Sequence, residues 1–369
     1  AEEICSMEDV DRGAKVGLRW ALGPFEIANR IGVSEASRMA SSYAEEAGLE
    51  LPEWFTERQE PFNFSYVDVV VNDSIATVRI NRPEAMNALN VTVVSQLGEM
   101  LEQLNVRDDI STIILEGAGK AFVAGADVKF FVDKIRADAI SDIYDFTAHG
   151  HAVLDKLENS PKTTIALTTG LALGGGLELA LACDYRVGTR RTQFRFPETS
   201  IGIYPGLGGT QRTPRICGIE CARYAVLAGN FLDAPSAKAL GLLSHLTEPS
   251  SIEAIVEAIH EQGKPLDKYP NRPADSDSPV VAFATSFYSD NNMTSLLAGK
   301  SPDGFDIEDK MVSRQLKSLS RAAPIALSMA SELLDEAAGA DLGSGLKSEL
   351  EGLDVIFGTV DALEGLSAL

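Results

Sequence analysis

The spacing of hydrophobic residues divides this chain into a helical beginning and a longer region in which strands alternate with helices. In residues 1–50, apolar side chains recur at roughly helical intervals, and Gly23 with Pro24 interrupts them. We therefore expect short helices on both sides of that break, the last of them ended by Gly48. Residues 51–65 contain prolines and charges without periodicity, and we interpret them as a linker.

From residue 66 the pattern is typical of an α/β protein. Two β-branched runs are separated by Asn72-Asp73-Ser74, which is a hairpin signal. Strands are predicted at residues 66–71, 75–80, 112–115 and 163–168, and helices at 91–104 and 142–158. Because strands alternate with helices, we expect a single α/β core over residues 66–246.

The remaining third of the chain has two different compositions. Residues 247–309 are rich in Pro, Asn and Asp, and we interpret them as a solvated, loop-rich insertion. Residues 310–369 are rich in Ala, Leu and Glu, which predicts helices that could dock on the core or mediate assembly.

Composition excludes several classes of function. The 369 residues include 32 Lys and Arg against 54 Asp and Glu, a net charge of −22, so a nucleic-acid partner is not expected. No apolar run approaches the ~18 residues of a membrane span, so no membrane partner is expected either. The chain opens without a signal-peptide pattern, and four cysteines are too few for a disulfide framework. We therefore expect a cytoplasmic location.

The most informative stretch is residues 170–180, GLALGGGLELA, where a strand gives way through three glycines to an apolar helix. A helix start presents unpaired N–H groups and the positive end of a dipole, both suited to stabilising an oxyanion. The alternative is a tight turn, with Glu178 merely favourable in the first helical turn.

Two further stretches strengthen the first interpretation. Residues 121–129, AFVAGADVK, form a small-residue loop that could supply a second N–H donor, as an oxyanion hole requires. Residues 196–211, FPETSIGIYPGLGGTQ, bring a second carboxylate, Glu198, beside a rigid Pro/Gly loop. Two carboxylates facing one water could add its elements to a double bond. Taken singly, these stretches could also be a compact loop and a surface acid.

Together the three stretches resemble the enoyl-CoA hydratase/isomerase (crotonase) superfamily. The family's opening motif is present at residues 80–90, INRPEAMNALN, and its closing motif at 357–365, FGTVDALEG. The resemblance runs from about residue 66 to the C-terminus, interrupted by the insertion. It implies an α/β spiral of repeated ββα turns, and a C-terminal helical region that assembles homotrimers, often paired into hexamers.

The resemblance also implies roles for individual residues. The backbone N–H groups of Ala126 and Gly175 would form the oxyanion hole for the thioester oxygen. The acyl-CoA thioester would be bound by Ala126, Asp127, Val128, Lys129, Gly175 and Gly206. Lys129, together with Arg82, is a candidate contact for the phosphates of CoA.

Glu178 and Glu198 match the family's catalytic pair, and retention of both favours hydration of a trans-2-enoyl-CoA to the (3S)-3-hydroxyacyl-CoA. We assign Glu178 to deprotonating the water and Glu198 to protonating Cα, although two close carboxylates titrate as a pair. No cofactor is expected, since coenzyme A is part of the substrate. A zinc site is not expected, because His149 and His151 lack other ligands at metal spacing.

The first 50 residues have a resemblance of their own. The runs MEDVDR at 7–12 and GLRWALGPFE at 17–26 resemble the C-terminal helical domain of 3-hydroxyacyl-CoA dehydrogenases. Residues 1–60 contain neither a G-x-G-x-x-G turn nor a His, so we expect no NAD use by this chain. The chain begins at Ala1, which fits the C-terminal part of a dehydrogenase–hydratase fusion.

Two alternatives stay open at this point. One is a Δ3-Δ2-enoyl-CoA isomerase of the same superfamily, which would shift a double bond rather than add water. The other is a non-catalytic assembly module, in which residues 1–50 and the C-terminal helices dock neighbouring subunits.

Overall fold

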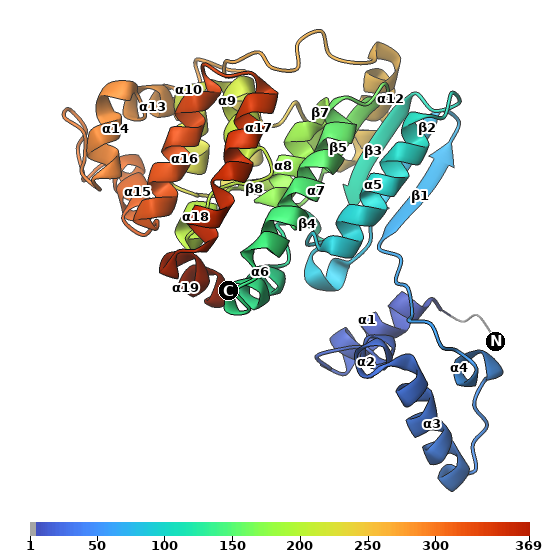
Figure 1. Ribbon diagram of the computed structural model, residues 1–369. Helices are drawn as coiled ribbons and strands as arrows, with labels where there is room; N and C mark the ends of the chain where they lie inside the picture. The colour runs from blue at the N-terminus through green and yellow to red at the C-terminus, as the bar shows by residue number, and fades with distance from the viewer. Residues whose placement is uncertain (1–4) are drawn as a thin grey trace. The chain divides into compact units, whose positions relative to one another are not determined.

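The computed structural model describes residues 5–369, which form two compact units, one ending at Tyr66 and the other spanning Val67–Leu369 (Figure 1). No helix within these described residues combines the length and the hydropathy needed to cross a bilayer. The family resemblance applies to the second unit.

The N-terminal unit is helical, as its hydrophobic pattern predicts. Its helices are α1 (Met7–Gly17), α2 (Pro24–Ile31), α3 (Val33–Ala47) and α4 (Glu53–Thr56). Ser6 caps α1 by accepting from the Asp9 N–H at 3.1 Å, and Gly48 ends α3 in the left-handed region at φ 66°. The buried carboxylate of Asp11 accepts from the N–H groups of Phe25 and Glu26, both at 2.9 Å, and so ties α1 to the start of α2.

Residues 51–65 belong to this unit and are not a free linker. Phe62 is only 4% exposed and lies in the small core of the unit, its ring 4.7 Å from the ring of Phe25. Trp54 and Phe55 pack around Phe62 as well. Burial of Phe62 among these rings outweighs the weak local periodicity that suggested a linker.

The second unit contains two sheets. The larger has the order β1-β2-β3-β5-β7-β10 and the smaller the order β4-β6-β8-β9. The strands are β1 (Val67–Asn72), β2 (Ile75–Ile80), β3 (Thr112–Gly117), β4 (Ala121–Ala124), β5 (Thr163–Thr168), β6 (Leu171–Leu173), β7 (Tyr185–Gly188), β8 (Gln193–Arg195), β9 (Leu232–Asp233) and β10 (His245–Leu246). From β3 to β8, successive strands alternate between the larger and the smaller sheet, and a helix follows each of the pairs β3–β4 and β5–β6, as in the predicted ββα spiral.

Helices cover both sheets and form the C-terminal region (Figure 1). They are α5 (Val91–Asn105), α6 (Val128–Arg136), α7 (Ile140–Glu158), α8 (Gly175–Ala182), α9 (Gly209–Cys217), α10 (Ile219–Val226), α11 (Ala234–Leu240), α12 (Ile252–Gln262), α13 (Pro279–Phe287), α14 (Asp290–Leu297), α15 (Lys310–Leu319), α16 (Pro324–Ala337), α17 (Leu342–Glu351), α18 (Leu353–Phe357) and α19 (Val360–Ser367). Three short 3₁₀ turns are η1 (Pro83–Ala85), η2 (Glu198–Ile201) and η3 (Pro249–Ser251).

Residues 247–309 contain three helices that their composition did not indicate, α12, α13 and α14, while residues 263–278 and 298–309 are loops. The buried side chains of Val281, Ala284 and Phe287 form the inner face of α13. The composition of the segment is dominated by the Pro, Asn and Asp residues between these helices, so composition alone does not indicate the short apolar stripes of the helices.

Helix α8 sets the position of the candidate site. All eight of its residues are buried, which suits its apolar sequence. A Cβ at Gly176 would lie only 2.0 Å from the carbonyl oxygen of Val123, so glycine there lets α8 lie directly against β4. The N-terminus of α8 is thereby held beside the ends of β4 and β6.

Candidate active site

A cavity of about 380 Å³ opens at the N-terminus of α8. Six of the residues that sequence reasoning assigned to the site line it: Ala126, Val128, Gly175, Glu178, Glu198 and Gly206. Much of the remaining wall is apolar and comes from α6, α7, α18 and α19, with Phe131, Phe146, Leu353, Phe357 and Leu366. Sequence reasoning missed this wall, since nothing in the pattern distinguishes cavity-lining from core-facing side chains.

Ala126 and Gly175 line the cavity, and their backbone N–H groups have no partner within residues 5–369. Strands β4 and β6 are parallel neighbours with Ala124 opposite Leu173, so the residues that follow them emerge at the same edge. The neighbouring N–H groups are both used: that of Asp127, which follows Ala126, donates to the Leu89 oxygen at 2.8 Å. That of Gly174, which precedes Gly175, donates to the Arg195 oxygen at 2.9 Å. Within residues 5–369, the N–H groups of Ala126 and Gly175 themselves donate to no protein acceptor. They are the two donors of a possible oxyanion hole.

Glu178 is held in one orientation by a neighbouring loop. Its Oε1 accepts from the N–H groups of Leu207 and Gly209, both at 2.7 Å. Its Oε2 lies toward Gly175, 3.9 Å from the position that a Cβ there would take. Burial raises the pKa of Glu178 to about 7, against the lowering effect of the two N–H donors and of Arg212.

Glu198 lies on η2 in a poorer environment for charge. Its Oε2 is buried and has no hydrogen-bond partner within the described residues 5–369. Its Oε1 lies close to Gly174: a Cβ added to that glycine would be 2.4 Å from it. Gly174 also has a positive φ of +48°, which favours glycine. Burial, and then the charge of Glu178, raise the pKa of Glu198 well above the usual 4.5.

These environments separate the two carboxyl groups chemically. Glu178, with a pKa of about 7, is poised to accept a proton near neutral pH, whereas Glu198 is favoured in its protonated form. A base and an acid on one cavity, with two N–H donors beside them, can move protons around a carbonyl-conjugated double bond.

Two predicted site residues are not brought to the cavity. Asp127 precedes α6, and its carboxylate accepts from Arg82 Nη2 at 3.1 Å. Lys129 is exposed on α6 and also lies outside the cavity lining. Neither residue lines this cavity, and their expected contacts with the acyl-CoA stay a prediction.

Sequence reasoning also missed a buried carboxylate that contacts the same loop as Glu178. Glu349 on α17 is 0% exposed and accepts from the N–H groups of Gly208 and Thr210 at 2.6 and 3.1 Å. His151, whose ring Nε2 lies 2.6 Å from the Gly206 oxygen, has its pKa lowered by burial to about 4. No group of three His, Cys, Asp or Glu residues in the described chain is placed to hold a metal ion.

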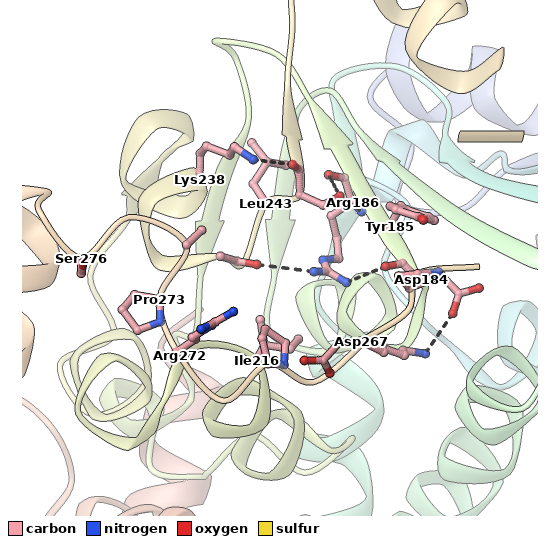
Figure 2. Close-up of a pocket in the computed structure, with 16 residues that line it drawn as sticks. Asp184, Tyr185, Arg186, Ile216, Lys238, Leu243, Asp267, Arg272, Pro273 and Ser276 are labelled. Carbon is pink, nitrogen blue, oxygen red and sulfur yellow. Dashed lines mark hydrogen bonds and ion pairs between the residues drawn. The ribbon is translucent and has the colours of Figure 1, made fainter. Parts of the chain in front are cut away.

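A second cavity, of about 590 Å³, is larger and basic but has a structural explanation (Figure 2). Arg186 donates to the carbonyl oxygens of Leu242 and Cys183, both at 3.1 Å. Lys268 donates to the Ala182 oxygen at 2.6 Å and pairs with Glu158. These cations hold the surrounding chain together, so the smaller cavity is the better candidate for catalysis.

The family profile that matches this chain is "Enoyl-CoA hydratase/isomerase", over residues 75–369. The crotonyl-CoA hydratase of Syntrophomonas wolfei is 34% identical over 198 residues, 53% of this chain and 75% of that protein. The short-chain-enoyl-CoA hydratase of Clostridium acetobutylicum is 36% identical over 179 residues, 48% of this chain and 67% of that protein.

Solved structures agree at the level of the fold. An enoyl-CoA hydratase from Rhodobacter sphaeroides superposes with a TM-score of 0.70 at 21% identity, covering 82% of this chain and 89% of that one. A carnitinyl-CoA dehydratase from Mycobacterium thermoresistibile gives 0.70 at 23% identity, covering 83% and 89%. The predicted crotonase-like α/β fold is therefore confirmed. Since the profile extends over most of its length, the chain belongs to the enoyl-CoA hydratase/isomerase family.

Proposed function

We propose that this chain adds water across the 2,3 double bond of a trans-2-enoyl-CoA to give the (3S)-3-hydroxyacyl-CoA. The observation that carries the proposal is the pair of buried carboxyl groups, Glu178 and Glu198, on one cavity beside two unpartnered N–H groups. The names of the two relatives, a crotonyl-CoA hydratase and a short-chain-enoyl-CoA hydratase, support the same reaction.

In the proposed mechanism the thioester oxygen accepts hydrogen bonds from the N–H groups of Ala126 and Gly175. Glu178 takes a proton from water while the water oxygen bonds to C3 and the double-bond electrons move toward the thioester. The enolate charge that results is stabilised by the two N–H dipoles. Glu198 then gives its proton to C2, and proton exchange between the two carboxyl groups and solvent restores the starting state.

The cavity lining supports a hydrocarbon as the acyl group. The side chains of Phe131, Phe146 and Phe357 provide an apolar wall opposite the polar end of the site. Lys129, which is exposed on the helix that begins at Val128, stays the proposed contact for the CoA phosphates. We propose that no cofactor takes part, because acid, base and water suffice for hydration.

Assembly, origin and location are proposed with it. Val355 and Val360 on the C-terminal helices are 60% and 78% exposed, which supports burial in a homotrimer or hexamer. The separate helical unit before residue 67 supports a fusion in which a helical domain of the 3-hydroxyacyl-CoA dehydrogenase type precedes the hydratase. The four free cysteines, Cys5, Cys183, Cys217 and Cys221, support a reducing, cytoplasmic setting.

The test is a hydration assay with crotonyl-CoA and a series of longer trans-2-enoyl-CoA thioesters, followed by the loss of enoyl-thioester absorbance. We expect the protein to convert these substrates to the 3-hydroxyacyl-CoA. A control reaction without the protein should show no conversion. A parallel assay supplies a 3-enoyl-CoA. If only that substrate is converted, to the conjugated 2-enoyl isomer, the chain is an isomerase and the proposal is wrong.

A further inference from the structure

Four consecutive N–H groups donate to buried carboxylates and alternate between two of them. They belong to the loop of residues 207–210, whose last two residues begin α9. The N–H groups of Leu207 and Gly209 donate to Glu178 Oε1, both at 2.7 Å. Those of Gly208 and Thr210, which lie between and after them, donate to Glu349 at 2.6 and 3.1 Å. The loop is therefore held between a residue of the candidate site and a residue of α17.

Glu349 itself is firmly placed. The Thr210 hydroxyl also donates to its Oε1, so both carboxylate oxygens are used as acceptors. The Tyr204 hydroxyl donates to the backbone oxygen of Glu349 at 2.6 Å and so anchors this point of α17. Glu349 does not line the cavity, and the proposed mechanism does not use it.

The carbonyl side of the loop is fixed as well. Arg212 Nη1 donates to the Leu207 oxygen at 3.0 Å, and His151 Nε2 lies 2.6 Å from the Gly206 oxygen. Gly208 has φ +97°, and a Cβ there would lie 1.9 Å from Arg212 Nη1, so only glycine fits. The charged or titratable groups that interact with Glu349 include Glu178, Arg212, Arg215, Tyr204 and His151, the last at 3.7 Å.

A carboxylate in this position has a cost that packing does not explain. A buried charge is expensive to desolvate, and an apolar side chain of similar size would usually be as stable or more so. Burial and the charge of Glu178 both raise the pKa of Glu349, so the two carboxyl groups titrate as a coupled pair. Its benefit lies in the loop it holds, because successive N–H groups that point opposite ways need acceptors on both sides.

We propose that Glu349 is a positioning residue for hydration: by holding Gly208 and Thr210, it aims the Leu207 and Gly209 N–H groups at Glu178 Oε1 and leaves Glu178 Oε2 turned toward Gly175. This inference rests on the proposed function for its kinetic consequence, although the geometry it claims can be tested separately. Glu349 touches neither the cavity nor the reacting atoms, so it acts through Glu178 alone.

The first variant is Glu349→Gln, which keeps the shape but sets an amide NH₂ against the N–H of either Gly208 or Thr210. We expect kcat for crotonyl-CoA to fall about 10- to 100-fold, since displacing a catalytic group by about 1 Å has effects of this size. KM should change less than about threefold, because the cavity lining is intact. Stoichiometric binding of saturated butyryl-CoA counts the folded sites, so that kcat is expressed per folded active site.

Two controls separate positioning from general damage. Glu351→Gln changes an exposed carboxylate on the same helix, one that pairs with Lys347 at 3.4 Å, and should leave kcat within about twofold. Thr210→Val removes the hydroxyl that donates to Glu349, whereas Thr210→Ser retains it. We expect the valine variant to lose severalfold more kcat than the serine variant.

A crystal structure of Glu349→Gln tests the geometry without reference to activity. We expect at least one of the two 2.7 Å contacts to Glu178 Oε1 to lengthen beyond about 3.5 Å. If both contacts are unchanged, the inference is wrong whatever the kinetics. It is also wrong if the loop opens while kcat per folded site stays at the wild-type value. Failure of the wild-type chain to hydrate any enoyl-CoA overturns the proposed function instead, and the crystal structure still decides the loop geometry.

Discussion

Two cavities of the second unit are lined by charged side chains, and they differ in what those side chains are bonded to. In the larger, basic one, Arg186 and Lys268 donate to backbone carbonyl oxygens or carboxylates. In the smaller one, the N–H groups of Ala126 and Gly175 and the Oε2 of Glu198 have no partner within residues 5–369. By charge and volume alone, the larger cavity would be chosen as the active site. The smaller cavity is the better candidate because its polar groups are available to bind a ligand.

The largest expected effect comes from neutralising either carboxyl group of the smaller cavity. Glu178→Gln and Glu198→Gln should each lower kcat for crotonyl-CoA by about 10²- to 10⁴-fold, the range that one acid or base contributes. Initial rates at saturating substrate measure this, with butyryl-CoA binding as the check on folding. Near-normal turnover in both variants would show that Glu178 and Glu198 are not the base and the acid, and the smaller cavity would no longer be favoured as the active site.

Crowding the acid should have the next largest effect. Gly174→Ala places a Cβ 2.4 Å from Glu198 Oε1 at a residue with φ +48°. We expect a loss of about 1–2 kcal/mol in the free energy of unfolding from the left-handed backbone, and about 10²-fold in kcat from displacing Glu198. Gly339→Ala is the matched control, since nothing lies within 4 Å of its added Cβ. Equal kcat values for the two variants would contradict this placement of Glu198.

The pH dependence should reflect Glu178. Because burial raises its pKa to about 7, Glu178 is protonated below that pH and cannot act as the base. The kcat/KM for crotonyl-CoA should therefore fall about tenfold for each pH unit below 7, while it approaches a plateau above it. Burial and the charge of Glu178 also raise the pKa of Glu198, which favours its protonated form. A profile that is flat down to pH 5 would exclude Glu178 as the base.

The smallest effect is expected in the larger cavity. Lys238 donates to the Ser244 oxygen and Arg272 is exposed, so neither is arranged to bind a reacting group. Lys238→Gln and Arg272→Gln should change kcat/KM less than about twofold, with at most a surface-type loss of about 0.5 kcal/mol in stability. Thermal unfolding and the same hydration assay check both values. A large loss of activity in either variant would mean that the basic cavity takes part in the reaction.

Local pattern was enough to predict several elements of this fold. The strands predicted at residues 75–80 and 163–168 match β2 and β5, because β-branched runs between turn residues have few alternatives. The three glycines before an apolar helix likewise placed Glu178 in the first turn of α8. These features depend on neighbours within a few residues, which a sequence displays directly.

The rest was decided by tertiary packing. Residues 51–65 have no periodic pattern, and their structure depends on the packing of Phe62 in the core of the unit, which includes the ring of Phe25. Helix α13 likewise depends on the burial of its inner face. Asp127 accepts a hydrogen bond from Arg82, 45 residues away in the sequence, and no motif indicated that Glu349 would contact the loop that holds Glu178. Local sequence determines which elements form and which chemistry they carry. Which carboxylates, N–H groups and rings converge depends on contacts between distant residues, where burial gives hydrogen bonds and charges their strength.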